Sequence, residues 1–267
     1  MQQIQNLVLA EKEKVAELRQ IKNYKKGSLI GEGSSGKVYQ GFDEDLGQII
    51  AIKEIDLQRI TNNKNIEAKI SSFQSEIDIL SKLNHKNIVK YYGTNRSPYS
   101  FHIFLEFCIG GSIAKMLDVY KFFSENIIRK YTRQILEGLL YLHAHNVIHR
   151  DIKGANILVE REGLCKLSDF GGAKVIKDEI EFKQQNSFKG TPNWMAPETV
   201  RNLEYSRFSD IWSVGCLVIE MATGEPPWAE YKNPMAALYN LMHTNSPPEF
   251  PAHLSDPCKH FLSCCLK

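Results

Sequence analysis

The sequence lacks several features that mark particular classes of protein. Basic and acidic residues nearly cancel, 33 against 31, so the chain carries little net charge to attract nucleic-acid phosphates or an anionic membrane surface. Its longest apolar run, residues 214–221, is interrupted by Glu220 and is far too short to span a bilayer. The N-terminus lacks the apolar stretch of a signal peptide. We therefore expect a protein that is not secreted and binds neither nucleic acid nor membrane.

The cysteines also lack the spacing of a structural site. None of the six forms a C-x-x-C pair or a paired Cys/His pattern, which argues against structural zinc. Most lie inside apolar runs, as reduced and buried thiols do, which indicates a reducing compartment and a cytoplasmic location.

Apolar patterning divides the chain into parts with different secondary structure. Residues 1–23 carry an apolar stripe typical of a helix, which we interpret as an N-terminal extension, either a regulatory helix or a solvated lead-in. Short glycine-punctuated strands follow at 28–30, 37–41 and 48–53. A helix is predicted around 66–80, and two more strands at 88–92 and 102–107.

Beyond this β-rich part the pattern is mainly helical. Residues 128–146 and 206–223 predict long helices, the second apolar on nearly every face and therefore buried. The stretch between them, 147–197, is rich in loops. We expect a small β-rich lobe at 24–107 with one main helix, and a larger helical lobe at 108–267, with ligands bound where such lobes meet.

A glycine-rich segment, Gly31-Glu32-Gly33-Ser34-Ser35-Gly36, is the first candidate site. It also matches the glycine-lysine core of a nucleotide-binding P-loop, but that motif continues with Ser or Thr, and here Val38 follows Lys37. The next residues alternate like a strand, whereas a P-loop opens a helix. The segment therefore predicts a β-hairpin whose backbone amides approach phosphates, although an ordinary glycine-rich hairpin remains an alternative.

A lysine inside an apolar strand is the second candidate. Lys53 follows Ala51 and Ile52 in a strand pattern, and a buried ammonium group needs a partner. We predict that Glu76, on the helix that follows, is this partner.

Three further motifs complete a recognisable set. They are His149-Arg150-Asp151 with Lys153 and Asn156, then Asp169-Phe170-Gly171, then Ala196-Pro197-Glu198. In their order and context they resemble the signature of eukaryotic protein kinases, from about Tyr24 to the C-terminus. The resemblance implies an α+β, bilobal kinase fold, with ATP and Mg²⁺ as cofactors.

The resemblance also implies roles for individual residues. Lys53, held by Glu76, would bind the α- and β-phosphates of ATP, and Asp151 would accept the proton of the attacking hydroxyl. Lys153 would place a positive charge near the transferred group. Asn156 and Asp169 would be the magnesium ligands. His149 and Phe170 would pack the core rather than bind a ligand.

The same resemblance implies a nucleotide pocket. The adenine would be enclosed by Ile30, Val38, Ala51 and Leu158. The backbone of Glu106 and Cys108 would bind its edge, and the glycine loop would cover the phosphates. Leu105 takes the gatekeeper position. The ATP-binding residues would be Ile30, Gly31, Glu32, Gly33, Ser34, Ser35, Gly36, Lys37, Val38, Ala51, Lys53, Glu106, Cys108 and Leu158.

Finer motifs resemble one branch of the family. Lys153 is typical of Ser/Thr kinases, and Thr191 would lie under the substrate hydroxyl and bind Asp151 and Lys153. The segment 189–198 and the segment 210–228 resemble the STE group and its MAP kinase kinase kinase branch. The implied protein substrate is a MAP kinase kinase. A STE20-like kinase is the nearest alternative, and a non-catalytic kinase-like binding module is an alternative of another class.

The resemblance further implies regulation through Arg150. We interpret this residue as an uncompensated cation beside Asp151 that pairs with a phosphorylated loop residue. Ser187 and Thr191 are the candidates, and Ser187 is favoured because Thr191 has a role toward substrate. The phosphate would come from an upstream kinase or from the protein itself.

The C-terminal end departs from the family pattern. In the family, further helices and an arginine that pairs with the glutamate of Ala-Pro-Glu follow a segment like 260–267. We therefore expect the C-terminal end to be truncated and Glu198 to be a buried carboxylate without its ion pair, at a cost of about 3–5 kcal/mol.

Overall fold

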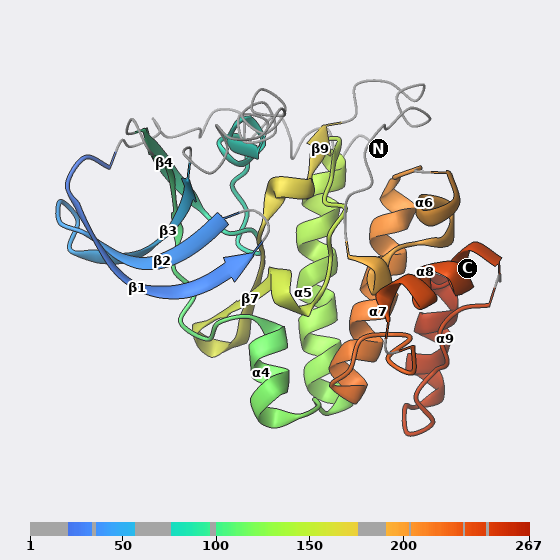
Figure 1. Cartoon of the computed structure of the whole chain (residues 1–267). Coiled ribbons are helices and arrows are strands. Elements are labelled where there is room, and N and C mark those ends of the chain that lie inside the picture. The colour runs from blue at the N-terminus through green and yellow to red at the C-terminus, as the bar shows by residue number, and fades with distance from the viewer. Residues whose placement is uncertain are drawn as a thin grey trace. The chain divides into compact units, whose positions relative to one another are not determined.

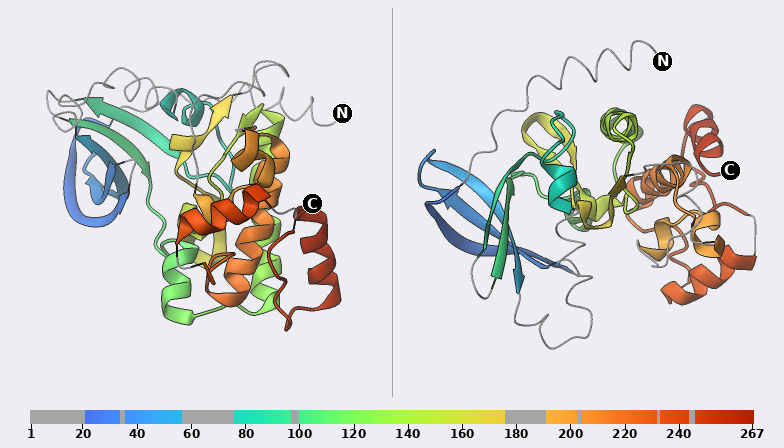
Figure 2. Two further views of the ribbon diagram at one scale, coloured as in Figure 1. Left: turned by 45° about the vertical axis from the view of Figure 1, so that its right-hand side comes forward. Right: turned by 90° about the horizontal axis from the view of Figure 1, so that it is seen from above.

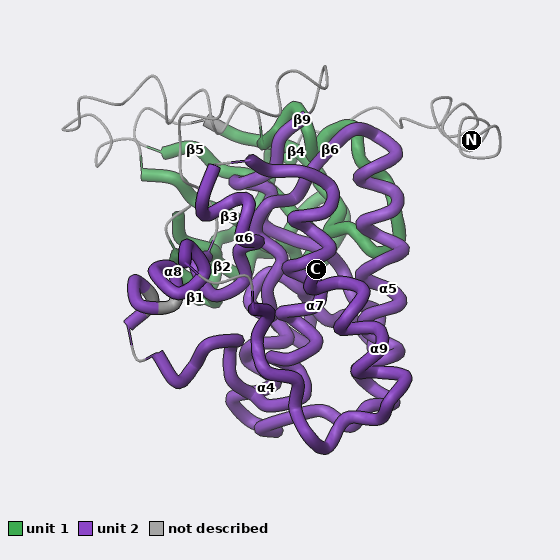
Figure 3. The backbone as a smooth tube through the Cα atoms, turned by 90° about the vertical axis from the view of Figure 1, so that its right-hand side faces the viewer, with its two compact units in different colours: residues 1–108 green, residues 109–267 purple. Residues whose placement is uncertain are grey.

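The chain divides into two compact units, residues 1–108 and residues 109–267 (Figure 3). The computed structural model describes residues 21–33, 36–56, 76–96, 100–175, 191–202, 204–231, 233–243 and 246–267. The predicted helix at 1–23, apart from its last three residues, therefore lies outside the described residues, as do Ser34, Ser35 and Ser187.

The first unit is built on a five-stranded antiparallel sheet, drawn in blue to green in Figure 1. Its strand order is β1-β2-β3-β5-β4, so consecutive strands β1, β2 and β3 form a meander. The alternation of apolar residues that predicted these strands faces a core of Ile21, Ile50, Ile52 and Phe104. The bounds are β1 Tyr24–Gly33, β2 Gly36–Asp43, β3 Gln48–Asp56, β4 Tyr91–Arg96 and β5 Ser100–Glu106.

Two predicted elements of this unit differ from the structure. The strand expected at 88–92 begins only at Tyr91. Ile88 and Val89 are buried, at 2% and 3% exposure, but the Ile88 amide donates to the His85 carbonyl in a turn. Ile88 forms an isolated bridge and Val89 belongs to no strand, so their apolar character reflects burial rather than membership of a strand. Of the helix predicted at 66–80, residues 76–80 are helical and the rest lies outside the described residues.

The second unit is mainly helical. Ser112 caps its first helix by accepting the amide of Lys115, and a capping box of Ser206 and Ser209 begins the buried helix. Gly224 ends that helix with a φ of 80°. The helices are α4 Ile113–Tyr120, α5 Glu125–Ala144, α6 Pro197–Asn202, α7 Arg207–Thr223, α8 Pro234–His243 and α9 Asp256–Cys265.

Helix α7 lies at the centre of this unit. As predicted from its apolar faces, residues 212–222 are all buried. Helices α5 and α9 pack against it, and α8 packs against α6 and the turn before α6; α7 and α9 lie side by side in both views of Figure 2. This packing makes α7 the scaffold from which polar side chains can hold loops in place.

Short elements connect α5 to α6. Strands β6 (Val147–Ile148) and β9 (Lys174–Val175) pair with each other, as do β7 (Ile157–Glu160) and β8 (Leu164–Leu167). Single 3-10 turns cover Gly154–Asn156, Arg161–Gly163, Phe170–Gly172 and Pro192–Trp194. Together the two units confirm the predicted α+β fold, with one β-rich and one helical part.

The cysteines are free thiols, and Cys108, Cys165, Cys216 and Cys265 are buried, as the sequence predicted for most of them. Burial raises the pKa of the Cys165 thiol to about 12. In the described residues no helix is long and apolar enough to cross a membrane.

Candidate active site

The glycine-rich segment forms the predicted β-hairpin, with β1 and β2 antiparallel and Gly33 opposite Gly36. Gly36 has a φ of +128°, and a Cβ there would lie 2.5 Å from the Glu54 carbonyl oxygen, so the fold itself requires this glycine. A Cβ at Gly31 or Gly33 would meet nothing within 4 Å. The fold does not require these two glycines, which leaves their backbone open to close approach from outside.

Several predicted nucleotide-binding residues share one face of the sheet. Val38 is paired directly with Lys53, and Gly31 is paired with Val38. Ala51 lies two residues before Lys53 on β3, hence on the same face, and is paired with Leu105. Glu106 ends β5, and its amide donates to the Lys90 carbonyl at 2.9 Å. The other predicted residues of this unit, Ile30, Glu32, Lys37 and Cys108, lie on β1, on β2 or just after β5.

Lys53 and Glu76 form the predicted ion pair. The Lys53 Nζ to Glu76 Oε1 distance is 2.6 Å, and the two side chains are only 5% and 2% exposed. Because an unpaired charge at this depth would be costly, each group needs the other. The pair fixes the lysine ammonium beside the face that carries Val38 and Ala51.

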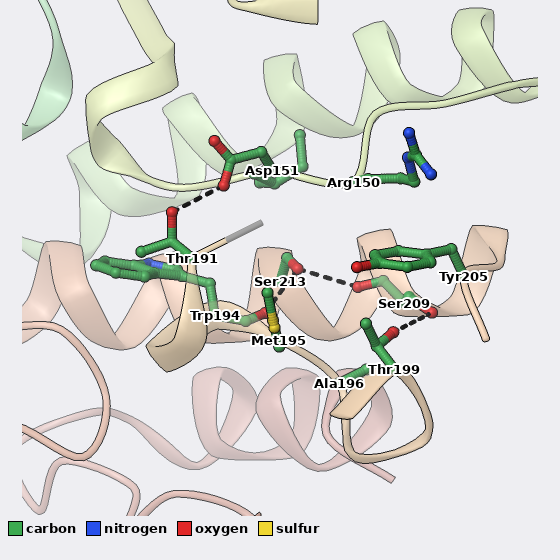
Figure 4. A pocket seen from close by; sticks show the side chains of 11 residues that line it. Arg150, Asp151, Thr191, Trp194, Met195, Ala196, Thr199, Tyr205, Ser209 and Ser213 are labelled. Carbon is green, nitrogen blue, oxygen red and sulfur yellow. Dashed lines mark hydrogen bonds between the residues drawn. The ribbon is translucent and has the colours of Figure 1, made fainter. Parts of the chain in front are cut away.

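In the second unit, Asp151 is the centre of a hydrogen-bonded cluster, of which Figure 4 shows the bond to Thr191. Thr191 Oγ1 donates to Asp151 Oδ1 at 2.9 Å, and Lys153 Nζ lies 2.9 Å from Asp151 Oδ2. Lys153 Nζ also donates to Thr191 Oγ1. A carboxylate, an ammonium and a hydroxyl therefore meet, as predicted for Asp151, Lys153 and Thr191.

Asn156 joins this cluster from the end of the same loop. Its Nδ2 donates to the Asp151 backbone carbonyl at 2.8 Å and to Asp151 Oδ2 at 2.7 Å. Because the amide nitrogen of Asn156 donates both bonds, its amide oxygen is the atom that can accept a hydrogen bond or bind a cation.

The β7–β8 hairpin brings Asn156 and Asp169 to one end. Ile157 is paired with Leu167, and Ser168 donates from both its amide and its hydroxyl to the Asn156 carbonyl, at 2.9 Å each. Asn156 thus lies just before β7 and Asp169 lies shortly after β8, at the same end of the hairpin. Leu158, predicted to contact adenine, lies on β7 and forms a bridge with Ser112.

His149 and Phe170 pack as predicted for core residues. The His149 ring is fully buried and lies 5.1 Å from the Phe170 ring between centroids. His149 Nε2 is 3.0 Å from the Ser168 carbonyl oxygen. These contacts connect the loop 149–156 to Ser168, the residue that precedes Asp169.

Two carboxylates on α7 hold this loop, and sequence reasoning missed both. Asp210, 1% exposed, accepts the amides of His149 and Arg150 at 3.0 and 2.9 Å. Glu220 accepts the Gly154 amide at 2.9 Å and Trp194 Nε1 at 2.8 Å. Burial raises the Glu220 pKa. Asp210 and Glu220 lie on a helix that is apolar on nearly every face. Because buried charges require partners, their presence there could have indicated that each accepts hydrogen bonds from another segment.

The described residues give Arg150 two uncharged partners, while its pairing with a phosphorylated loop residue stays a prediction because residues 176–190 lie outside the described residues. Its Nε donates to the Gly172 carbonyl, and its guanidinium lies over the Tyr205 ring, 5.0 Å from the centroid. The loop leaves the Arg150 side chain half-buried, in contact with both groups.

Glu198 differs from its prediction. It is half-buried, not buried, and its Oε1 accepts a hydrogen bond from Ser209 Oγ at 2.9 Å. The expected penalty for a buried carboxylate without a partner therefore does not apply to this side chain.

Comparisons with known proteins agree with this geometry. The family model described as protein kinase domain matches residues 24–267. Mitogen-activated protein kinase kinase kinase A of Dictyostelium discoideum is 42% identical over 98% of this chain and 28% of its own length. YODA, a mitogen-activated protein kinase kinase kinase of Arabidopsis thaliana, is 46% identical over 91% of this chain and 27% of its own length.

A human relative, mitogen-activated protein kinase kinase kinase 3, is 40% identical over 90% of this chain and 38% of its own length. This chain thus spans 27–38% of the length of these three relatives. The predicted resemblance is confirmed: the chain belongs to the protein kinase family, with relatives among the MAP kinase kinase kinases.

Proposed function

We propose that this chain is an ATP-dependent Ser/Thr protein kinase that phosphorylates a MAP kinase kinase in the cytoplasm. The cluster of Asp151, Lys153 and Thr191 carries the proposal, because it joins a proton acceptor to a cation and a hydroxyl. The names of the relatives support the choice of substrate. An incoming Ser or Thr hydroxyl attacks the γ-phosphorus, the bond from that phosphorus to the β-bridging oxygen breaks, and ADP leaves.

The roles of the chain's own residues follow from their chemistry. Asp151 orients the attacking hydroxyl and accepts its proton. Lys153 stabilises negative charge on the transferred group, and its bond to Thr191 keeps both near Asp151. Lys53, fixed by Glu76, binds the α- and β-phosphates, while the open backbone at Gly31 and Gly33 suits phosphate approach. Leu158 contributes apolar surface toward adenine.

Asn156 and Asp169 suit magnesium. Within the described residues no three His, Cys, Asp or Glu side chains gather into a metal cluster, but Mg²⁺ is usually held by one or two protein oxygens together with phosphates and water. The Asn156 amide oxygen and the Asp169 carboxylate are such hard ligands at one hairpin end. When bound, the metal neutralises charge on the phosphates.

Regulation is proposed through Ser187. The Thr191 hydroxyl is already engaged by Asp151 and Lys153, which favours Ser187 as the phosphorylated residue, modified by an upstream kinase or by the protein itself. A Ser187→Ala protein expressed in cells should then phosphorylate substrate more slowly than wild type. Equal rates would contradict this part of the proposal.

The test is phosphate transfer by the purified chain from Mg²⁺-ATP to a catalytically inactive MAP kinase kinase, beside a STE20-type substrate and a generic Ser/Thr protein. We expect transfer to the MAP kinase kinase and its loss in Asp151→Asn. Preference for the STE20-type substrate would favour that branch. Nucleotide binding without transfer to any of the three would support the non-catalytic binding module instead.

A further inference from the structure

Arg150 adopts a backbone conformation that needs support from the rest of the fold. Its φ is +68°, in the left-handed region that residues with a side chain rarely adopt. Its amide donates to Asp210 Oδ1 at 2.9 Å, and the amide of His149 donates to the other oxygen of the same carboxylate. Helix α7 therefore fixes the backbone immediately before Asp151.

The Arg150 side chain is held separately from its backbone. Its guanidinium lies over the Tyr205 ring, with 5.0 Å from Cζ to the centroid, and its Nε donates to the Gly172 carbonyl. Arg150 is half-buried, and burial lowers the pKa of its guanidinium. Cation–π attraction grows as the cation is removed from water.

Tyr205 is itself firmly placed. It is 2% exposed and stands between α6 and α7. On one side Thr199 Oγ1 donates to the Glu204 carbonyl at 2.9 Å, and on the other Ser206 caps α7. Figure 4 shows the Tyr205 ring beneath Arg150, in the pocket that Asp151 and Thr191 also line. Tyr205 thus holds the guanidinium of Arg150, and Asp210 holds its backbone.

We propose that Tyr205 is a positioning residue for phosphoryl transfer, acting through the cation–π contact with Arg150. The Tyr205 ring contacts the Arg150 guanidinium. The Nε of that guanidinium donates to the carbonyl of Gly172, which lies three residues after Asp169. Arg150 is also bonded covalently to Asp151. Tyr205 therefore sets the position of the proton acceptor relative to the segment that carries a magnesium ligand. This inference rests on the proposed kinase function.

Replacing the ring tests the contact. Tyr205→Leu should lower kcat about tenfold, since misplacement of reacting groups by about 1 Å can cost up to about 100-fold, and leave KM for ATP within about twofold. Tyr205→Phe, which keeps the aromatic face, should retain most of the wild-type rate.

In an Arg150→Gln background, Tyr205→Leu should change kcat less than about twofold, because the contact is already gone. Tyr131→Leu, at another buried tyrosine of this unit, is the matched control and should lower kcat equally in both backgrounds or not at all.

A shape-conserving series guards against a leucine variant that fails to fold. Phenylalanines with one, two and three ring fluorines at position 205 weaken the negative ring face with little change of shape, so kcat should fall stepwise. The inference would be overturned if kcat did not change with the number of ring fluorines. It would also be overturned if Tyr205→Leu lowered kcat equally with and without Arg150.

Thermal melting provides a readout that does not depend on kinase activity. The Tm losses of Tyr205→Phe with three ring fluorines and of Arg150→Gln should combine to less than their sum, which indicates coupling. Strictly additive losses would overturn the inference. If the wild-type chain phosphorylates no substrate, the proposed function fails, and the melting cycle still decides whether the contact exists.

Discussion

The carboxylate of Glu220 lies so close to Gly154 that residue 154 has no room for a side chain. The Gly154 amide donates to Glu220 Oε2 at 2.9 Å, and a Cβ at residue 154 would lie 2.4 Å from Glu220 Oε1. Gly154 stands between Lys153 and Asn156, so this contact connects α7 to the loop that carries the proposed catalytic residues.

Gly154→Ala should therefore displace the loop or Glu220. We expect a loss of about 1–3 kcal/mol in the free energy of unfolding, typical of steric and hydrogen-bond disruption in a core, together with lower kinase activity. Urea unfolding measures the first. Gly172→Ala is the matched control, since its Cβ would lie 3.5 Å from the nearest atom and φ there is not positive; a similar loss in both variants would contradict the explanation.

Glu220 should make stability depend on pH. Burial raises its folded-state pKa above the ordinary 4.5, so the native state binds this proton more tightly than the unfolded chain does. The free energy of unfolding should then fall as pH rises from about 4.5 through the folded-state pKa, and stay level above it. Glu220→Gln, which keeps an oxygen for Gly154 and Trp194, should flatten this part of the profile. Exposed Glu162→Gln should retain it, and a profile unchanged in Glu220→Gln would rule out Glu220 as the source.

The Lys53–Glu76 pair allows stability and catalysis to be separated. Lys53→Met leaves a buried carboxylate without its cation and should cost about 3–5 kcal/mol. Adding Glu76→Leu should recover most of that stability but none of the activity, which should stay at least about 100-fold below wild type since phosphate binding is lost. Lys25→Met, in the exposed pair with Glu44, should leave the unfolding midpoint unchanged. Activity that returns with stability would show that Lys53 acts only in folding.

Thr191 should matter through its hydroxyl. Thr191→Val keeps the shape but loses the bonds to Asp151 and Lys153, and hydrogen bonds to charged groups contribute about 1.5–3 kcal/mol each. We expect kcat/KM for a protein substrate to fall about 10-fold to 100-fold, with Thr191→Ser retaining most of it. Steady-state phosphorylation of one substrate by the three proteins is the measurement, and equal values for Val and Ser would refute the role.

Local patterns predicted those parts of the site whose residues are near each other in sequence or carry a costly charge. A lysine inside an apolar strand pointed to Glu76 because burial of a charge demands a partner. The loop from His149 to Asn156 was predicted because its polar residues interrupt apolar runs, whereas the β7–β8 hairpin after it was not predicted. The glycine hairpin followed from alternation on both sides of it.

Other features were not readable from local patterns. Ile88 and Val89 looked like a strand because burial and strand pairing select the same residues. The two partners of Arg150 were not predicted, because nothing near it in sequence marks Tyr205 or Gly172. Asp210 and Glu220 lie about 60 residues from the amides they bind, at |i−j| of 60 to 66.

The sequence alone determined the family, the α+β fold and the identities of the candidate reacting groups, because glycines, buried charges and motif spacing leave few physical alternatives. Only the tertiary structure decided what holds those groups in place. Helix α7 does so with Asp210 and Glu220, and Tyr205 does so through Arg150. Such contacts arise when distant segments pack together, and a one-dimensional pattern does not encode which buried donor meets which buried acceptor.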